Sequence, residues 1–417
     1  MFVLLSDGAG LTSRQCATLL AAAGHRVEAL SPQPLCLSRL TRHVRAVHRV
    51  PGLGADPRRW LDAALDVATR RGAELLLPVQ EQVTVMSLER ERIAAAGLLT
   101  AVPDFAALRQ VQDKVSAFRT LDRLGLPQPL GQVVTSRETL KTLGGAPVFV
   151  KTPIGTASAG TWRITSPSDL ARLADRLDQA QLDWQQGVLV QQPAAGPLVM
   201  VQSVFARGEL IAFHACERIR EGASGGSSHK RGLTLPAARE HLAALGRALG
   251  WHGALSADVI LTGRGPLFID VNPRLVEPAN AYQSGVDLTA TLVEVARSGT
   301  APPQPDGRAG VRTHQGLLAV LGEAARTGHR RDVARELAQA LTRTGPYWRS
   351  TEELTPLRWP APSAAPAQTR PDLVGAAPYA AAAVATLLHP PAGRRFVSGA
   401  TSAYSLTPAA WQVLTVT

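Results

Sequence analysis

Two aspartates in one short segment carry the clearest chemistry in this sequence. Asp258 and Asp270 enclose two apolar runs that are joined by the glycine-containing residues 263–265. An apolar run, a glycine-bearing turn and a second apolar run are typical of a β-hairpin. With Arg264 taken as the centre, the two carboxylates are cross-strand partners on one face of the hairpin. Like charges in that position repel each other, so the pattern calls for a cation.

Asn272 adds a third oxygen ligand to this pair. Side chains alternate between the faces of a strand, so Asn272 shares the face of Asp270. Two carboxylates and an amide oxygen suit Mg²⁺ (or Mn²⁺), and Mg²⁺ in proteins usually keeps substrate phosphates among its ligands. The segment therefore predicts a metal site that works with a nucleotide. The alternative is an exposed hairpin with two solvated acids.

One lysine has the chemistry to bind the phosphates of such a nucleotide. Lys151 ends the apolar run 148–150 and precedes a loop of small residues that includes Gly155, Ser158 and Gly160. An ammonium group binds phosphate oxygens, and small residues let backbone N–H groups approach them closely. Lys114 lies in a helical pattern over residues 104–123. The spacing lacks GxxxxGK[ST], which argues against a P-loop NTPase.

The elements before these lysines alternate between strand and helix. The pattern predicts strands at 2–5, 26–30 and 74–79 and helices at 12–23 and about 60–71. This βαβ order favours a parallel sheet. The first turn contains Gly8 and Gly10 but has Ser13 where a dinucleotide fingerprint needs its third glycine, so we expect a cofactor-free turn. A dinucleotide-dependent enzyme remains an alternative.

Three further charged residues are candidates for contacting substrate. Glu81 follows a strand at the sheet edge where α/β proteins bind ligands, although a solvated loop acid fits equally well. Arg218 and Arg220 precede the polar residues 222–231, which we interpret as a flexible loop that either closes on an anionic substrate or is a surface loop. The later predicted elements are strands at 148–151 and 188–190, an extended pair at 133–134, a hairpin of 199–205 with 209–215, helices at 237–249, 315–341 and 378–388, and a Pro- and Ala-rich linker at 356–371.

Composition excludes several classes of protein. The 417 residues carry a net charge of +11, but the basic stretches are short and aromatic residues make up only 5%, so we expect no nucleic-acid partner. No apolar run is long enough to span a membrane, and the first residues lack the features of a signal peptide, which predicts a cytoplasmic protein. The 3 cysteines show no metal-binding spacing and are expected to be free thiols.

Taken together, the motifs occur in a recognisable order. Lys114, Lys151 with its glycine loop, the segment Gln191-Gln192-Pro193 and the hairpin ending in Asn272-Pro273-Arg274 resemble those of the ATP-grasp superfamily. The chain is similar to its carboxylate-amine ligases, near the branch of biotin carboxylase and the carbamoyl-phosphate synthetase large chain. The resemblance covers about residues 1–300.

The resemblance implies an α/β fold, α+β in its ATP-grasp part. It implies a Rossmann-like N-terminal domain at residues 1–104 and a two-lobed ATP-grasp domain at residues 105–299. The lid would span about residues 130–190, and the metal-binding and catalytic subdomain about residues 191–299. Residues 300–417 form a helical and extended region without an assignable motif; a lid, a dimer surface and a substrate cover are its open alternatives.

The same resemblance implies a role for each candidate residue. Lys151 and Arg274 would be catalytic, with Arg274 steadying the transferred phosphoryl group. The implied ATP contacts are Lys114, Lys151, Gly155, Ser158, Gly160, Val190, Gln191 and Gln192, and the implied metal ligands are Asp258, Asp270 and Asn272. The expected reaction uses ATP and Mg²⁺ to convert a carboxylate into an acylphosphate, which an amine or related nucleophile then attacks. A homodimer is compatible with this assignment.

Two residues depart from the family pattern. Gln192 stands where the hinge commonly has a glutamate for the ribose, and Asp270 stands where the second metal ligand is usually a glutamate. Aspartate is one methylene shorter, about 1.5 Å, whereas Mg²⁺ holds its ligands at a nearly fixed distance. These departures motivate an alternative function, a non-catalytic ATP-binding sensor or partner subunit.

Overall fold

The computed structural model describes residues 1–417 except 144, 157–158, 343–371, 373, 394–400 and 417. The predicted linker at 356–371 lies outside the described residues. Among the helices that are described, none has the length and apolar character to cross a membrane. The strands of the described residues form one four-stranded parallel sheet, one four-stranded antiparallel sheet and one six-stranded antiparallel sheet. The predicted mixed α/β fold class is confirmed.

The N-terminal sheet has the strand order β3-β2-β1-β4. Its strands are β1 (Phe2–Leu5), β2 (Arg26–Ser31), β3 (Val47–Arg49) and β4 (Leu75–Leu77), and the helices connecting them include α1 (Leu11–Ala22) and α2 (Pro57–Arg71). Side chains of β1 and β4 are buried on both faces, which is why these strands are continuous apolar runs without alternation. The predicted parallel βαβ arrangement is therefore present. Short helices η1 (Leu37–Arg39), α3 (Val83–Leu88) and α4 (Arg90–Ala95) complete this part.

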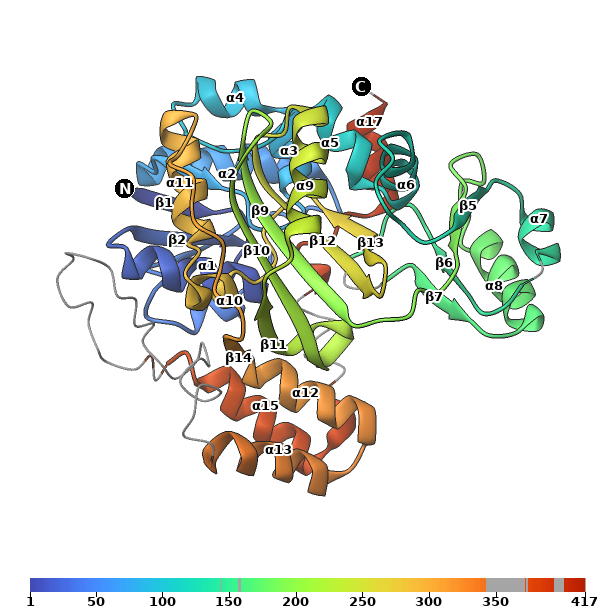
Figure 1. The fold of residues 1–417 in the computed structure, drawn as a ribbon. Coiled ribbons are helices and arrows are strands. Elements are labelled where there is room, and N and C mark those ends of the chain that lie inside the picture. Colours follow the sequence, from blue (N-terminus) through green and yellow to red (C-terminus); the bar gives the residue numbers. More distant parts are fainter. Residues whose placement is uncertain (144, 157–158, 343–371, 373, 394–400, 417) are drawn as a thin grey trace.

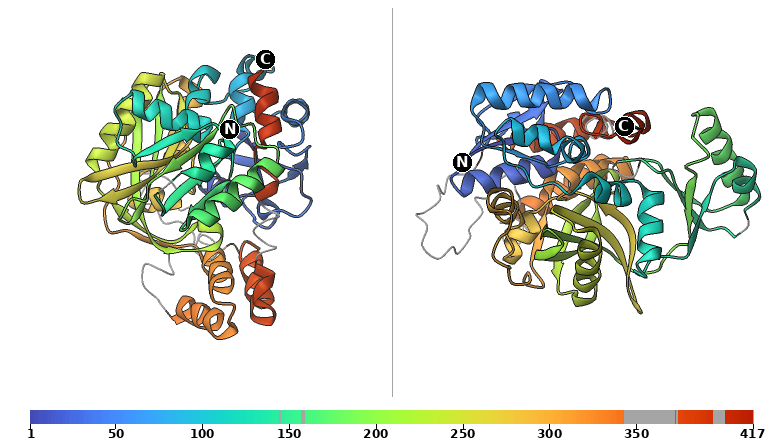
Figure 2. Two further views of the ribbon diagram at one scale, coloured as in Figure 1. Left: turned by 90° about the vertical axis from the view of Figure 1, so that its right-hand side faces the viewer. Right: turned by 90° about the horizontal axis from the view of Figure 1, so that it is seen from above.

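A small sheet stands beside the rest of the molecule (Figures 1 and 2). Its order is β5-β8-β6-β7, with β5 (Gly131–Val134), β6 (Val148–Lys151), β7 (Thr161–Ile164) and β8 (Val188–Gln191). Helices α7 (Arg137–Thr142) and α8 (Pro167–Gln179) pack on it and supply Leu140, Leu170 and Leu173 to a separate apolar core. This unit therefore packs around its own core, separate from that of the large sheet.

The large sheet has the order β13-β12-β9-β10-β11-β14. Its strands are β9 (Leu198–Ala206), β10 (Glu209–Glu221), β11 (Ser227–Leu233), β12 (Gly253–Thr262), β13 (Gly265–Asn272) and β14 (Arg312–His314). Helix α9 (Pro236–Leu249) shares a core with Leu255 and Ala257, whereas α11 (Leu288–Ser298) shares another with Ala254. Alternate residues of β12 thus face opposite helices, as the period of a strand requires. Helix α10 (Ala279–Ser284) precedes α11.

The single helix predicted over residues 104–123 is wrong, because the segment forms two helices, α5 (Phe105–Gln112) and α6 (Lys114–Arg123). Asp113 is extended between them, and its carboxylate accepts a 2.7 Å hydrogen bond from the backbone N–H of Ser116. This is an N-cap, and it starts a new helix at Lys114. The freed backbone N–H of Lys114 donates to the Pro153 carbonyl at 2.9 Å, which ties the start of α6 to the loop after β6.

The prediction for residues 315–341 also merges two helices. Gly328, at φ 67°, ends α12 (Gly316–Thr327), and α13 (Arg330–Thr342) follows. These helices pack with α15 (Ala377–Leu388) at the bottom of Figure 1. The C-terminal segment continues through η3 (Pro390–Ala392) to α17 (Pro408–Thr415), where Trp411 meets Phe105 edge to face with ring centroids 6.0 Å apart.

The flexible loop predicted at residues 222–231 is wrong. These residues form the short 3₁₀ helix η2 (Ala223–Gly225) and most of β11, which pairs with β10 on one side and β14 on the other. His229 and Lys230 are buried there. Their polarity suggested a loop, but acidic side chains from distant parts of the sequence accompany them, so burial does not leave them without charge partners.

Candidate functional site

The β12–β13 hairpin brings Asp258 and Asp270 into direct register. The count from Arg264 that predicts this pairing is wrong in its detail, because Thr262 pairs with Gly265 and the turn lies at Gly263-Arg264. From there Val259 opposes Phe268, and the register shifts before Asp258. The extra residue is Ile269, a β-bulge that restores the opposition of the two acids and re-aims the strand next to the site.

The carboxylate pair is strongly perturbed. Burial, together with the neighbouring Asp270, raises the pKa of Asp258 to about 7, against the opposing effect of Arg218 and Arg274. Asn272 follows on the same strand and lines the same cavity. Two carboxylates and an amide oxygen that are poorly hydrated and mutually repulsive fit a hard divalent cation such as Mg²⁺, which would neutralise them.

Lys151 lies directly behind the bulge. Its ammonium donates a hydrogen bond to the Ile269 carbonyl at 2.5 Å, and its side chain is buried. Burial lowers the pKa of Lys151 to about 8, with Asp270 and Asp258 acting in the opposite direction. Lys114 donates to the Gly155 carbonyl at 3.0 Å, and both lysines face one cavity. The structure thus places two cations and two acids from four elements, α6, β6, β12 and β13, around a common space.

That space is a cavity of about 920 Å³ between the N-terminal sheet, the small sheet and the large sheet. Most of the predicted site residues line it: Glu81, Lys114, Lys151, Gly155, Gln191, Gln192, Arg218, Asp258, Asp270, Asn272 and Arg274. Val190, Gly160 and Arg220 are not in the lining, and Ser158 lies outside the described residues.

Val190, Gln191 and Gln192, at the end of β8, differ in what they present to the cavity. The side chain of Val190 is buried in the apolar core of the small sheet and does not line the cavity, and its predicted ATP contact stays a prediction. Gln191 and Gln192 reach the cavity, and the Gln192 backbone N–H donates to the Leu130 carbonyl at 2.8 Å. Gln191 is buried with no hydrogen-bond partner for its side-chain oxygen, so a ligand donor would satisfy that oxygen.

The glycine loop is closed by backbone contacts. A Cβ at Gly155 would lie 2.0 Å from the Ala159 carbonyl oxygen, so only glycine fits there. Gly160, at φ 75°, accepts a 2.8 Å hydrogen bond from the backbone N–H of Thr152. Gly160 thus forms a turn that shapes the loop after β6, and it does not line the cavity.

Arg274 is held by Glu81. Its Nε and Nη2 donate to the same carboxylate oxygen of Glu81 at 3.2 and 3.1 Å, and both side chains are buried. The second oxygen of Glu81 accepts from Gln112 at 3.2 Å. Glu81 is thereby committed to orienting Arg274 rather than free to meet a substrate, although it borders the cavity.

The two arginines before η2 have separate surroundings. Arg218 lines the cavity, donating to the Gly225 carbonyl at 3.0 Å. Arg220 points away toward the C-terminal helices, where it forms ion pairs with Glu323 of α12 and Glu336 of α13. Strict alternation would place both side chains on one face, but the β-bulge at Ile219, between Arg218 and Arg220, turns the end of β10 and sends Arg220 the other way. The substrate-contact interpretation of Arg220 is not supported.

Sequence reasoning missed a charged pair at the cavity. Glu277 lines it and forms an ion pair with the buried Lys230 of β11. Glu277 also has φ 49°, a left-handed conformation that is costly for a residue with a Cβ, and its N–H donates to Thr12 at 3.2 Å. Strained residues of this kind cluster at functional sites. The sequence could have indicated Glu277, because it is an acid shortly after Arg274, but no sequence feature indicated Lys230.

One end of the cavity is apolar and is built from three distant parts of the sequence. Leu11 and Leu37 come from the N-terminal part, Ala223 from η2, and Leu317 and Leu318 from α12; they pack in a single cluster. All five line the cavity. The role of the C-terminal region could not be assigned from sequence, and here it forms a wall of the site.

In the glycine turn after β1, the hydrogen-bond donors are taken up by Asp7 of the same turn. Asp7 accepts hydrogen bonds from the backbone N–H groups of Ala9 and Gly10 at 3.0 and 2.8 Å and from the Ser13 hydroxyl at 2.7 Å. These are the donors that a dinucleotide pyrophosphate would use. The arrangement supports the expected cofactor-free turn.

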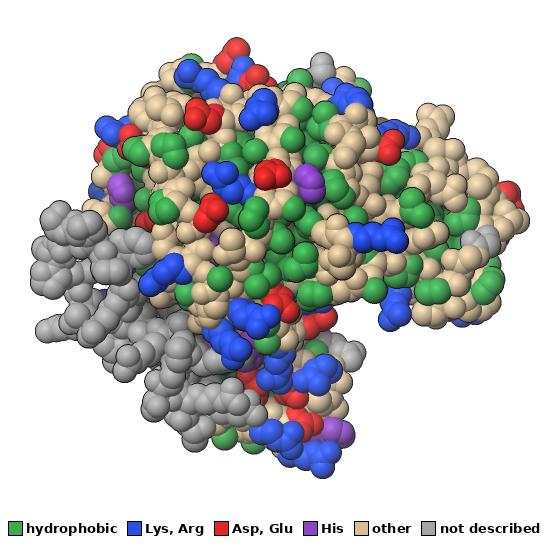
Figure 3. Space-filling model, in the orientation of Figure 1, with side chains coloured by type: hydrophobic (Ala, Val, Ile, Leu, Met, Phe, Trp, Pro, Cys, Tyr) green, Lys and Arg blue, Asp and Glu red, His purple; other side chains and the backbone are tan. Residues whose placement is uncertain are grey.

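The three cysteines are free and buried, as expected. Basic side chains on the face shown in Figure 3 are interspersed with acidic and hydrophobic ones and do not merge into one broad patch.

Comparison with known proteins gives a consistent answer at the level of the fold. No protein-family model and no curated protein matches the sequence. Among solved structures, a Campylobacter jejuni biotin carboxylase complex with β,γ-ATP is 17% identical, with a TM-score of 0.58 over 75% of this chain and 74% of that chain. The biotin carboxylase domain of Hydrogenobacter thermophilus 2-oxoglutarate carboxylase, solved as a dimer with MgADP, ADP and bicarbonate, is 18% identical, with a TM-score of 0.58 over 75% and 73%.

A third structure widens the range of reactions among these neighbours. The Bacillus licheniformis L-amino acid ligase is 14% identical, with a TM-score of 0.55 over 72% of this chain and 74% of that chain. These proteins are carboxylate-amine ligases of the ATP-grasp type. The order of the lysines, the hinge and the acidic hairpin agrees with the three-dimensional likeness, and the chain has the ATP-grasp fold of these ligases.

Proposed function

We propose that this protein is an ATP- and Mg²⁺-dependent ligase that activates a carboxylate as an acylphosphate and joins it to an amine or related nucleophile. The observation that carries the proposal is the convergence of Lys114, Lys151, Asp258, Asp270 and Arg274 on one cavity. Two cations opposite two acids match the needs of phosphoryl transfer, in which positioning and charge neutralisation lower the barrier.

Each of these residues has a defined task in the proposed reaction. Lys151 and Lys114 bind the phosphate oxygens of ATP, and Asp258, Asp270 and Asn272 would hold Mg²⁺, which supplies charge neutralisation between the phosphates. The bulge at Ile269 compensates for the short side chain of Asp270 by re-aiming the strand. Arg274, oriented by Glu81, stabilises charge on the transferred phosphoryl group.

The apolar end of the cavity supports a substrate with an apolar part. Leu11, Leu37, Leu317 and Leu318 bound the space beyond the charged residues. Glu277 lines the same cavity and is paired with Lys230, which suits it to orient a charged substrate group. We propose that the apolar moiety of one substrate lies against these leucines while its reacting group meets Arg274.

A non-catalytic ATP-binding sensor or partner subunit is the second candidate, favoured by Gln192 at the hinge and by Asp270. The neighbours' bound nucleotides agree with either function. A homodimer, a cytoplasmic location and the domain limits at residues 104 and 299 also remain predictions.

The decisive experiment measures ADP and phosphate release from Mg-ATP in the presence of a panel of carboxylates and amines. We expect substrate-dependent ADP release, and a reduction of at least about 100-fold in Lys151→Ala and Asp258→Asn. Lys141→Ala is the matched control, because Lys141 of α7 pairs with Asp175 of α8 and neither residue lines the cavity. ATP binding without any substrate-dependent ADP release across the panel would favour the sensor.

A further inference from the structure

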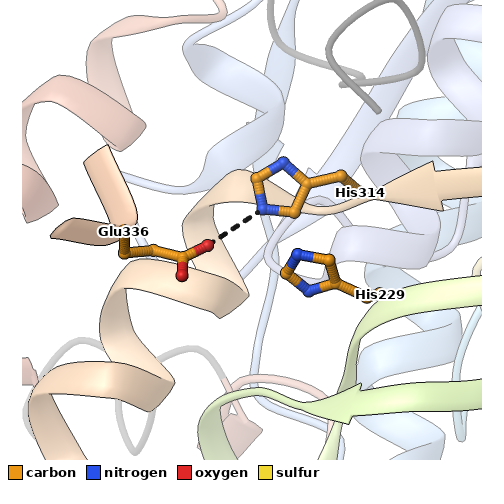
Figure 4. A group of neighbouring side chains, drawn as sticks. All are labelled: His229, His314 and Glu336. Carbon is orange, nitrogen blue, oxygen red and sulfur yellow. Dashed lines mark ion pairs between the residues drawn. The ribbon is translucent and has the colours of Figure 1, made fainter. Parts of the chain in front are cut away.

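A second cluster of metal-binding groups lies outside the cavity. His229 of β11, His314 of β14 and Glu336 of α13 each offer one ligand atom, and these atoms lie within 4.8 Å of one another. All three residues are buried. Figure 4 shows both rings and the carboxylate directed into the same space.

The backbone fixes this arrangement. His229 and His314 are directly paired in the β11–β14 register, and their ring centroids are 4.3 Å apart. Glu336 approaches from α13, with its carboxylate 3.3 Å from His314 Nε2. In a tetrahedral zinc site, bonds of about 2.0–2.1 Å place neighbouring ligand atoms roughly 3.3–3.4 Å apart, so this separation already matches one edge of the tetrahedron.

The groups around the cluster hold the ligands in place. His229 Nδ1 lies 3.0 Å from the Ser228 hydroxyl, which leaves Nε2 as its ligating atom. Arg220 binds Oε2 of Glu336, while Oε1 is the oxygen that faces His314. Hydrogen bonds of this kind from outside the ligand set orient metal ligands and tune their affinity.

We propose that His229, His314 and Glu336 bind a first-row divalent metal ion, Zn²⁺ by its preference for imidazole and carboxylate ligands. The ion would join the last strands of the large sheet to α13. Two imidazoles and one carboxylate are an established zinc ligand set, with water in the fourth position. Because α12 packs directly against α13 and carries Leu317 and Leu318, the ion would also fix the apolar wall of the cavity.

The test uses the full chain without a histidine tag, dialysed against Zn²⁺ and then metal-free buffer, with bound metal measured by mass spectrometry. We expect about one zinc per chain, in keeping with a single three-ligand site. A His229→Ala/His314→Ala double variant should lose it, whereas His329→Ala, which removes an exposed histidine at the start of α13, should keep it.

Two further measurements keep the test informative if the double variant fails to fold. Co²⁺ in the wild-type chain should give the visible absorption of a tetrahedral ion, and Ser228→Ala should weaken Zn²⁺ binding about 10-fold. A chelator should lower the unfolding temperature of zinc-loaded wild type but not of Glu336→Gln. Absence of bound zinc from wild type, or equal zinc in wild type and the double variant, overturns the proposal. ADP release plays no part in these readouts, so they are independent of the proposed ligase activity.

Discussion

At the scale of single residues, the site combines groups that disfavour one another in the absence of ligand. Asp258 faces Asp270 across the hairpin, and burial raises its pKa to about 7 from 3.8. A carboxyl group with a raised pKa in the folded state binds its proton more tightly there than in the unfolded chain. Ionisation therefore costs stability, and this cost grows as the pH rises from about 4 to about 7.

Asp258→Asn should stabilise the ligand-free protein while abolishing turnover. At pH 8 and without Mg²⁺, we expect the unfolding free energy of the variant to exceed that of wild type by roughly 1–3 kcal/mol, because a neutral amide removes the repulsion. The difference should shrink toward pH 4, where the wild-type carboxyl is protonated. Denaturant unfolding at the two pH values measures it, and a variant that is less stable at pH 8 would contradict the assigned electrostatics.

At the scale of elements, glycines decide how closely helix and sheet approach. Gly322 of α12 lies against the backbone of Gly222, and a Cβ there would come within 2.6 Å of the Gly222 carbonyl carbon. These are main-chain atoms, which cannot move aside as the end of a flexible side chain could. This close approach lets α12 place Leu317 and Leu318 at the cavity.

Gly322→Val should displace α12 from η2. We expect a loss of about 1–3 kcal/mol in unfolding free energy, as overpacking usually causes, and impaired turnover. The neighbouring Ala325 is exposed on the same helix, so Ala325→Val tests for a general effect of valine in α12. Equal stability of the two variants, measured by thermal unfolding, would show that the contact is unimportant.

At the scale of the whole molecule, the cavity exists only because three parts of the chain meet. The charged end uses the small and large sheets, and the apolar end uses the N-terminal part, η2 and α12. In the proposed function, nucleotide chemistry and substrate selection would use different walls of the cavity.

Leu318→Gln should alter substrate use without altering ATP use. We expect KM for apolar substrates to rise about 10-fold or more, since burying an unpaired amide costs more than 1 kcal/mol, with KM for ATP unchanged. Val384→Gln on α15 is the control, because Val384 is 58% exposed and does not line the cavity. Steady-state kinetics with a homologous series of substrates measures the change. An equal rise in KM for ATP would place Leu318 at the nucleotide instead.

The sequence by itself determined the elements whose signals are local. The parallel βαβ start follows from continuous apolar strands, and the hairpin with its acids follows from apolar runs around a glycine turn. Lys151 and Arg274 were also identifiable, because Lys151 ends a strand and Arg274 closely follows one. Lys114 was identified only through the order of motifs in the family resemblance. The helix breaks at Asp113 and Gly328 were missed, since a cap and a left-handed glycine interrupt an otherwise continuous helical pattern.

Only the tertiary structure decided which groups are partners across long separations in sequence. The Glu81–Arg274 and Lys230–Glu277 pairs, the bulge at Ile269 and the apolar wall from α12 depend on packing between distant segments. The polar residues of β11 gave the strand a loop-like sequence. It can be buried because acidic side chains on other elements accompany its His229 and Lys230. Local patterns report the conformation and chemistry of a segment, whereas charge partners and cavity walls arise when the chain folds back on itself.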